Sequence, residues 1–460
     1  MIPSTFRSHL SPTISLAYPV VLSQLGHVMV NVVDSMVVGQ TGKIPLAAVS
    51  LAMSVSTVVM VLGLGLTMGI TPLVAAADGR QDEAANGRLL VNGVWLSTVA
   101  GLLLAALGFL VPTLLPHLGQ PEAVVLLASP WVKVLFLSFF PLMIFQGFKQ
   151  FAEGLGLTRQ AMSLSIQANI VNAVLSYGLV FGKLGMPELG MMGAAWSTVV
   201  ARVLMAGLMA WYVLRARRLQ PYRLAAQANL RPDTAGLRRL LGLGTPIGVQ
   251  MTFEMGAFSF SAIMIGWLGA TQLAAHQIAI NVASVTYMAA SGIGAAATIR
   301  VGKFFGAHDG VRARQAGLMA YLLTFVFMCL TGLVLVLGRN YLPFYYNHDP
   351  AVVAQAATLL LIAAAFQISD GLQVVGLGAL RGLEDVKVPS VVALLAYWVI
   401  ALPLGYVLGF KLQWGAVGVW MGLLIGLTLV AGLLLWRFYR RPLLAAADTA
   451  PVNEPALAVR

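Results

Sequence analysis

Long apolar segments, separated by short polar stretches, run along almost the whole chain of 460 residues. The stretch from Met255 to Ile299 contains no Lys, Arg, Asp or Glu. About 20 apolar residues in a helix cross the ~30 Å hydrocarbon core of a bilayer. This stretch therefore predicts most of two spans, with a tight turn near Gly269 to Gln272. Twelve membrane helices are predicted along the chain in this way, at 14–38, 47–76, 90–114, 129–150, 161–183, 191–214, 241–267, 274–300, 316–338, 352–380, 389–409 and 414–437.

The composition agrees with this pattern, because 59% of the residues are hydrophobic and only 10% are charged, with a mean hydropathy of +0.86. Soluble globular domains carry about 25% charged residues. We therefore expect an all-α polytopic membrane protein surrounded by lipid. The net charge of +12 does not indicate a nucleic-acid partner, because the basic residues are scattered over short loops.

The basic residues lie mainly on one side of the predicted membrane. Most of the 28 Lys and Arg residues, among them Lys149, Arg300 and Arg381, are assigned to the tails and to the loops after even-numbered helices. Because cytoplasmic loops carry an excess of Lys and Arg, both termini and the central loop are predicted to be cytoplasmic. Arg202 is the main basic residue within a span. The exceptions on the opposite side are Lys43, Lys133, Lys183, Arg339 and Lys411.

The two halves of the chain repeat each other at an offset of 227 residues. Pro19 matches Pro246, and Gly42 matches Gly269. Six spans per half make the repeats parallel, which suits a transporter with its binding cavity between two bundles. The predicted organisation is a six-helix lobe at 1–217, a cytoplasmic connecting loop at 218–240, a second six-helix lobe at 241–440 and a cytoplasmic tail at 441–460.

Three acidic residues, Asp34, Glu254 and Asp370, stand alone inside apolar spans. A carboxylate within a bilayer is expensive and faces a water-filled cavity, a cation or a proton exchange. Asp34 aligns with Ser261 in the repeat, so the scaffold is duplicated but the charge is not. This asymmetry indicates that the carboxylates serve function and predicts ion-coupled transport.

Glu254 and Asp370 lie on the seventh and tenth predicted helices, where they can share one cation if the two helices touch. The hydroxyls of Tyr287 or Ser291 can add oxygen ligands for Na⁺. Close carboxylates also favour uptake of a proton, so the residues do not separate Na⁺ from H⁺ coupling. The sequence contains no His/Cys cluster with metal-ligand spacing and no phosphate-binding G-x-x-x-x-G-K-[ST] loop. We expect no cofactor, and no metal beyond Na⁺ at Glu254 and Asp370.

Several segments carry a resemblance to a known family. They include VNVVDSMVVG in the first span, TFEMGAFSF in the seventh, LAAHQIAIN in the eighth and SDGLQVVGLGALRGLEDVKVP around the tenth. Together they resemble the multidrug and toxic compound extrusion (MATE) family, in its NorM-type branch, from about residue 10 to residue 440. The resemblance implies a bacterial cytoplasmic-membrane transporter that exports diverse, often cationic and amphipathic drugs in exchange for Na⁺ or H⁺.

The resemblance also implies roles for individual residues. The positions of Glu254 and Asp370 are associated with cation binding in this branch, and that of Tyr287 contributes in some members. The substrate or proton site is assigned to Asp34, with Asn172 and Gln277. One departure is Ser176, where some relatives carry a second asparagine.

The preferred mechanism is antiport by alternating access, and a monomer suffices because one chain contains both lobes. Two alternatives stay open. A lipid-linked oligosaccharide flippase of the same superfamily needs basic residues inside the cavity, whereas the spans hold acids and almost no bases other than Arg202. An intramembrane enzyme that uses Glu254 and Asp370 as acid and base lacks an accompanying nucleophile or metal. The chain is therefore expected not to be an enzyme.

Overall fold

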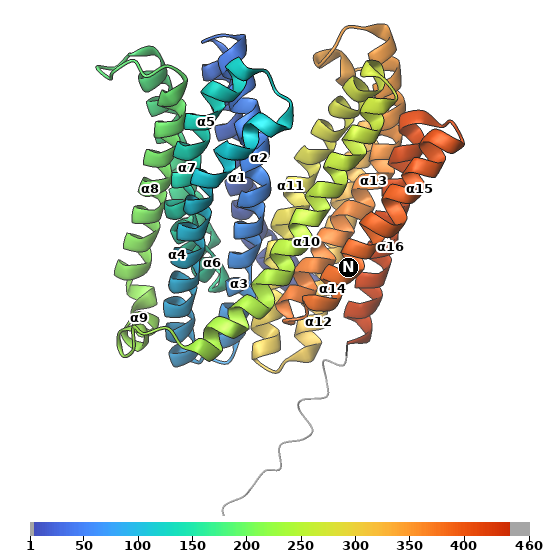
Figure 1. Ribbon diagram of the computed structural model, residues 1–460. Helices are drawn as coiled ribbons and strands as arrows, with labels where there is room; N and C mark the ends of the chain where they lie inside the picture. The colour runs from blue at the N-terminus through green and yellow to red at the C-terminus, as the bar shows by residue number, and fades with distance from the viewer. Residues whose placement is uncertain (1–3, 442–460) are drawn as a thin grey trace, which may run out of the picture.

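Two helical lobes stand side by side, touch at one end and diverge at the other (Figure 1). This computed structural model describes residues 4–441, and the predicted tail beyond residue 441 lies outside the described residues. The described chain forms twelve long helical segments, as predicted.

The amino-terminal lobe contains six of these segments. Two of them are broken within the membrane: Gly69 separates α2 from α3, and Ser138 separates α5 from α6. The helices are α1 (Ser4–Gly39), α2 (Lys43–Met68), α3 (Ile70–Gly79), α4 (Glu83–Leu114) with η1 (Leu115–Leu118), α5 (Glu122–Leu137), α6 (Phe139–Gly154), α7 (Thr158–Phe181) and α8 (Met191–Arg215).

The carboxy-terminal lobe repeats the arrangement, and the short helix α9 (Gln220–Gln227) links the lobes after the turn η2 (Arg217–Leu219). The range 218–240 is therefore only partly a loop, because the next helix begins at Thr234. The helices are α10 (Thr234–Trp267), α11 (Ala270–Gly306), α12 (Gly310–Gly338) with η3 (Leu342–Tyr345), α13 (Pro350–Gly382), α14 (Lys387–Leu395), η4 (Ala396–Ala401), α15 (Leu402–Tyr406), η5 (Val407–Lys411) and α16 (Gly415–Arg440).

Eleven segments of the described chain are long and apolar enough to cross a membrane. The twelfth, α10, is long enough, but Gln250, Thr252 and Glu254 make its central part more polar. A helix that keeps polar side chains at membrane depth must turn them toward protein or water. The least apolar span is therefore the one with the strongest reason to face the inside of the molecule.

The repeat extends to the backbone of the turns. Gly42 and Gly269, which are 227 residues apart, precede α2 and α11 with φ of 134° and 124°. Only glycine adopts such angles without strain, which explains why both halves keep it. The aspartates Asp82 and Asp309, also mates in the repeat, cap α4 and α12 by accepting hydrogen bonds from Ala85 N and Arg312 N.

The lobes meet through paired glycines. Gly79 of α3 packs against the backbone of Lys303, and Gly306 of α11 packs against the backbone of Ala76. These two contacts exchange when each residue is replaced by its repeat mate. Because a Cβ atom at either glycine would collide with a carbonyl oxygen, the two helices approach as bare backbones at this end.

Polar contacts reinforce the same end. Lys303 Nζ of one lobe lies 2.7 Å from Asp78 Oδ2 of the other, and Tyr222 of α9 donates a hydrogen bond of 3.1 Å to Asp78 Oδ1. Burial, together with the Asp78 charge, raises the pKa of Tyr222 to about 12. The phenol therefore stays protonated and remains a donor throughout the physiological range.

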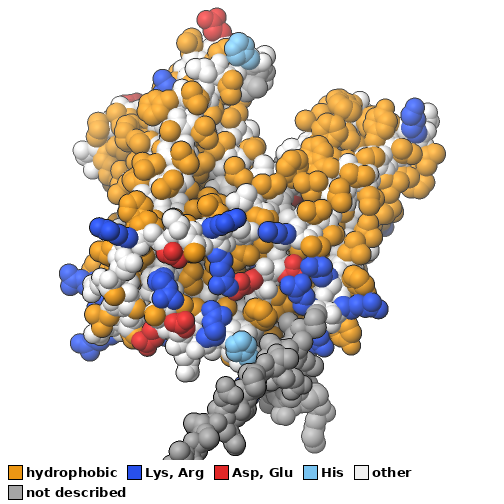
Figure 2. Space-filling model, turned by 60° about the horizontal axis from the view of Figure 1, so that its bottom comes forward, with side chains coloured by type: hydrophobic (Ala, Val, Ile, Leu, Met, Phe, Trp, Pro, Cys, Tyr) orange, Lys and Arg blue, Asp and Glu red, His pale blue; other side chains and the backbone are white. Residues whose placement is uncertain are grey.

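The surface divides into a charged end and an apolar remainder. Figure 2 shows Lys and Arg side chains gathered on the end where the lobes join, whereas the two diverging prongs are covered mainly by hydrophobic side chains and leave a notch between them. A transmembrane protein exposes apolar side chains to lipid and charges to water. The protein therefore joins its lobes at the basic end and separates them toward the other.

Candidate functional site

A cavity of about 470 Å³ lies between the lobes. Its walls come from α1, α2, α3, α5, α6, α7 and α8 on one side and from α10, α11 and α13 on the other. Asp34 from the first lobe and Glu254 from the second both line it. The structure therefore brings two of the three predicted carboxylates to a single space.

Asp34 on α1 is held by hydroxyl groups of two neighbouring helices. Ser176 of α7 donates to Oδ1 at 3.1 Å, and Thr198 of α8 donates to Oδ2 at 3.2 Å. The residue is 6% exposed, so these bonds replace most of its water. Arg202, which also lines the cavity, lies close enough for its charge to attract that of Asp34. Ser176, the departure from some relatives, therefore still takes part in the cluster.

Asn172 lies one turn of α7 from Ser176 and lines the same cavity. Its amide nitrogen is 3.4 Å from both Ser197 Oγ and Thr198 Oγ1, and its buried carbonyl oxygen has no hydrogen-bond partner within residues 4–441. Asn172 thus reaches Asp34 through their shared partner Thr198, and it keeps a free acceptor.

Glu254 on α10 accepts three hydrogen bonds. Gln250, one turn earlier on the same helix, donates to Oε2 at 2.7 Å, and Gln373 of α13 donates to Oε1 at 3.1 Å. The third donor is the Tyr397 hydroxyl, at 3.2 Å from Oε1. These bonds join α10, α13 and η4 around one carboxylate.

Tyr397 is a residue that the sequence analysis missed. It lies in η4, a π-helical turn that interrupts an otherwise α-helical span, and such turns are frequent at functional sites. Its hydroxyl is also 2.9 Å from Gln373 Oε1. A buried tyrosine usually finds a partner for its hydroxyl, and this was the only signal available in an apolar span.

Asp370 on α13 lies one turn before Gln373 and is close enough to Glu254 for the two charges to repel when both are ionised. Asp370 is 6% exposed, is not among the residues that line the cavity, and has no hydrogen-bond partner for Oδ1 within the described chain. A buried carboxylate oxygen without a donor suits a bound cation or a proton. The residues present therefore fit either coupling ion.

The other predicted residues differ in placement. Tyr287 of α11 is half-buried and lines the cavity, whereas the Ser291 hydroxyl accepts a hydrogen bond of 3.1 Å from Gln24 of the first lobe. Gln277 is exposed, donates to Asn281 Oδ1 at 3.3 Å and is not among the cavity residues. The structure does not bring Gln277 to Asp34 and Asn172.

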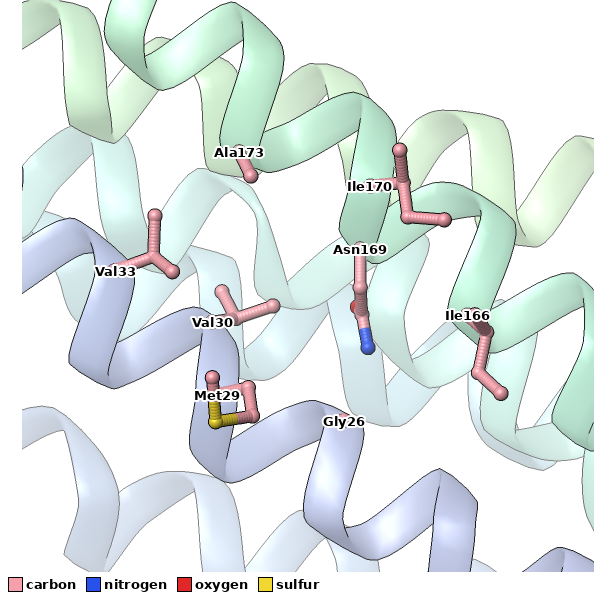
Figure 3. Close-up of a pocket in the computed structure, with 8 residues that line it drawn as sticks. All are labelled: Gly26, Met29, Val30, Val33, Ile166, Asn169, Ile170 and Ala173. Carbon is pink, nitrogen blue, oxygen red and sulfur yellow. The ribbon is translucent and has the colours of Figure 1, made fainter.

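A smaller hollow of about 230 Å³ lies between α1 and α7. Figure 3 shows Asn169 pointing from α7 toward Gly26 of α1, with apolar side chains around it. Asn169 and Val30 line this hollow and also the central cavity. One layer of side chains therefore separates the two spaces.

Comparison with known proteins follows this geometry. The family MatE matches residues 19–178 and 246–407. The two matched segments begin at Pro19 and Pro246, which are mates in the repeat.

The chain belongs to the MatE family.

Relatives and a solved structure agree with this membership. The "Multidrug resistance protein NorM" of Burkholderia vietnamiensis is 37% identical over 444 residues, covering 95% of this chain and 95% of that protein. The "Probable multidrug resistance protein NorM" of Xylella fastidiosa (strain 9a5c) is 34% identical over 435 residues, covering 95% and 92%. A solved multidrug resistance MATE family transporter, described as outward-facing, has a TM-score of 0.85 at 20% identity, covering 93% and 95%. The predicted family and fold are confirmed.

One prediction about this MatE protein was wrong. Lys149, Arg300 and Arg381 do not lie in loops but on α6, α11 and α13, and all three are mostly buried or half-buried. Lys149 and Arg381 line the cavity, and Arg381 donates to Gln250 Oε1 at 3.0 Å. The helices extend beyond their predicted ends, so these side chains enter the protein. Acids and bases therefore both line the cavity.

Proposed function

We propose that this protein exports chemically diverse drugs across the cytoplasmic membrane in exchange for a cation, Na⁺ or H⁺. The names of the relatives support multidrug efflux, and the buried carboxylates support coupling to a cation. The same names do not favour the flippase or the enzyme. The basic end of the molecule is assigned to the cytoplasm, so the notch between the prongs faces outward.

One observation carries this proposal: Asp34 and Glu254, from lobes that can move as separate bundles, line the same cavity, and Asp370 lies beside Glu254 with an oxygen free of donors. In the outward-open protein, the external cation binds at Glu254 and Asp370 and reduces their mutual repulsion. Drug bound in the cavity near Asp34 is released outward. After the lobes rock to open inward, the cation leaves and the next drug binds.

The lining suits ligands of varied shape. Methionine side chains are flexible and polarisable, and they adapt to different apolar surfaces. The two lobes contribute Met53, Met60, Met68, Met205, Met251, Met255 and Met288 to the cavity wall.

The test is efflux from proteoliposomes under a Na⁺ gradient and a pH gradient, each imposed alone, with the wild type and Glu254→Gln. We expect one gradient to drive ethidium transport in the wild type and neither to drive it in the variant, because an amide carries no negative charge for the cation. The exposed Glu122, at the start of α5, supplies the matched control Glu122→Gln. Gradient-driven transport by Glu254→Gln at the wild-type rate would refute the proposal.

A further inference from the structure

One face of α6 carries four polar residues into the cavity. Gln146, Lys149, Gln150 and Glu153 follow the i, i+3, i+4, i+7 spacing that places side chains along one side of a helix. All four line the central cavity, and none of them belongs to the Asp34 or Glu254 clusters. The face therefore forms a third polar region, here called the α6 face, within the same space.

The ion pair in the α6 face is loose. Lys149 Nζ lies 3.8 Å from Glu153 Oε1, although both side chains are at most 8% exposed. A charge-assisted hydrogen bond between such groups spans about 2.7–2.9 Å. The two charges compensate each other without forming a hydrogen bond, so a ligand that brings a better geometry can compete for either one.

The α6 face also has unused hydrogen-bonding capacity. Gln146 is 6% exposed, and its buried Oε1 atom has no partner within residues 4–441. Gln150 Oε1 is occupied, because it accepts a hydrogen bond of 2.5 Å from Thr71 of α3. A buried amide oxygen without a donor is costly, and a ligand donor would satisfy it.

The opposite wall has a different character. At the offset of 228 that relates Gly154 to Gly382, the α6 face corresponds to a face of α13 that also lines the cavity. Three of the four mates are apolar or lack a side chain, and only Arg381 is charged. The mates are Val374, Leu377, Gly378 and Arg381. The cavity thus offers a polar wall in one lobe and a largely apolar wall in the other.

We propose that the α6 face selects the cationic group of an amphipathic substrate, which binds to Glu153 in place of Lys149. This inference rests on the proposed function and adds a binding site to it. The ammonium of Lys149 neutralises Glu153 while the cavity contains no drug, which avoids an unpaired buried carboxylate. A substrate cation replaces Lys149 at the carboxylate, while the apolar part of the substrate contacts the α13 wall.

The experiment measures dye binding to the full-length protein in detergent, without any ion gradient. Its probes are ethidium, a permanent cation, and Nile red, an uncharged dye. Glu153→Gln should weaken ethidium binding about 10-fold or more, as expected for one charge-assisted contact, and change Nile red binding less than twofold. Lys149→Met removes the competing ammonium, so ethidium should bind at least as tightly as in the wild type.

Controls separate recognition from a structural role. Arg312→Met breaks an exposed ion pair with Asp309 on the surface and should change neither Kd. A melting curve of each variant shows whether it folds, and the double variant Lys149→Met with Glu153→Met, which leaves no unpaired charge, should repeat the selective loss of ethidium. Unchanged ethidium binding in Glu153→Gln, or equal weakening of both dyes in every variant, overturns the inference. Gradient-driven transport by Glu254→Gln would instead overturn the proposed function.

Discussion

The carboxylate clusters of the two lobes differ although the lobes share one scaffold. In the first lobe a single carboxylate, Asp34, accepts bonds from two hydroxyls and lies near the guanidinium of Arg202. In the second lobe two carboxylates, Glu254 and Asp370, lie close together, and the donors around them all serve Glu254. The first cluster is compensated by protein groups, whereas the second retains uncompensated acidity.

This difference assigns different partners to the two lobes. A second carboxylate with a free oxygen attracts a small cation or a proton, because the protein offers no donor there. A carboxylate already satisfied by hydroxyls and lining a wide cavity is suited to a bulkier cationic ligand. Duplication supplied two equivalent frames, and separate substitutions gave each its chemistry.

The strongest way to break this comparison is to neutralise one carboxylate in each lobe. Asp370→Asn should reduce gradient-driven ethidium efflux more than 10-fold while leaving equilibrium ethidium binding within about twofold. Asp34→Asn should instead weaken ethidium binding about 10-fold, since a charged contact contributes roughly 1.5–3 kcal/mol. Transport and binding assays on the same preparations check both results. The reverse pattern would show that the assignment of ion and drug to the lobes is wrong.

The paired glycines test whether the lobes are equivalent as scaffolds. Gly79→Ala and Gly306→Ala each place a methyl group against a carbonyl oxygen of the other lobe, and overpacking of this kind costs about 1–3 kcal/mol. We expect equal losses, measured by thermal unfolding in detergent. Gly432→Ala, where a Cβ meets nothing within 4 Å, is the control and should not destabilise the protein. Unequal losses would mean that the pseudo-symmetric contacts are not energetically equivalent.

Single hydrogen bonds sharpen the comparison further. Tyr397→Phe removes one donor from Glu254, and Ser176→Ala removes one donor from Asp34. Each bond is worth about 0.5–1.5 kcal/mol, or roughly a 2- to 10-fold change in an equilibrium. Tyr397→Phe should shift the cation concentration for half-maximal transport, and Ser176→Ala should shift the Kd for ethidium. A shift of the same parameter by both variants would contradict the division.

The smallest effect is expected at the ion pair between the lobes. The Lys303 side chain is 57% exposed, so its pair with Asp78 is screened by water and salt. Lys303→Met should destabilise the protein by less than about 1 kcal/mol, because Asp78 keeps its bond from Tyr222. Melting temperatures at low and high salt measure this, and the difference from the wild type should vanish at high salt.

Much of the fold follows from local sequence rules. Apolar runs predict the spans, and glycines at repeated positions predict the turn before α11 and its mate before α2, where the backbone angles require them. The carboxylates Asp34, Glu254 and Asp370 stood out because an acid in an apolar span has no inexpensive alternative to a polar surrounding.

Other parts of the site depend on contacts that no local rule contains. Tyr397 reaches Glu254 because a π-helical turn lies beside α10, and nothing in an apolar span predicts that proximity. Lys149 and Arg381 were assigned to loops because they lie within about two turns of the helix ends, where hydropathy changes gradually. Their burial is set by the opposing lobe, which the sequence pattern does not place.

The bare glycine contacts between α3 and α11 also bear on how readily the two halves part. Where side chains interlock, separation requires each one to change rotamer and withdraw from its socket. At Gly79 and Gly306 two smooth ridges touch, so the surfaces can come apart or roll without such rearrangement. The same smoothness leaves no tolerance, since one added methyl wedges the ridges apart. Low friction and low tolerance are thus two results of one omission, the missing side chain.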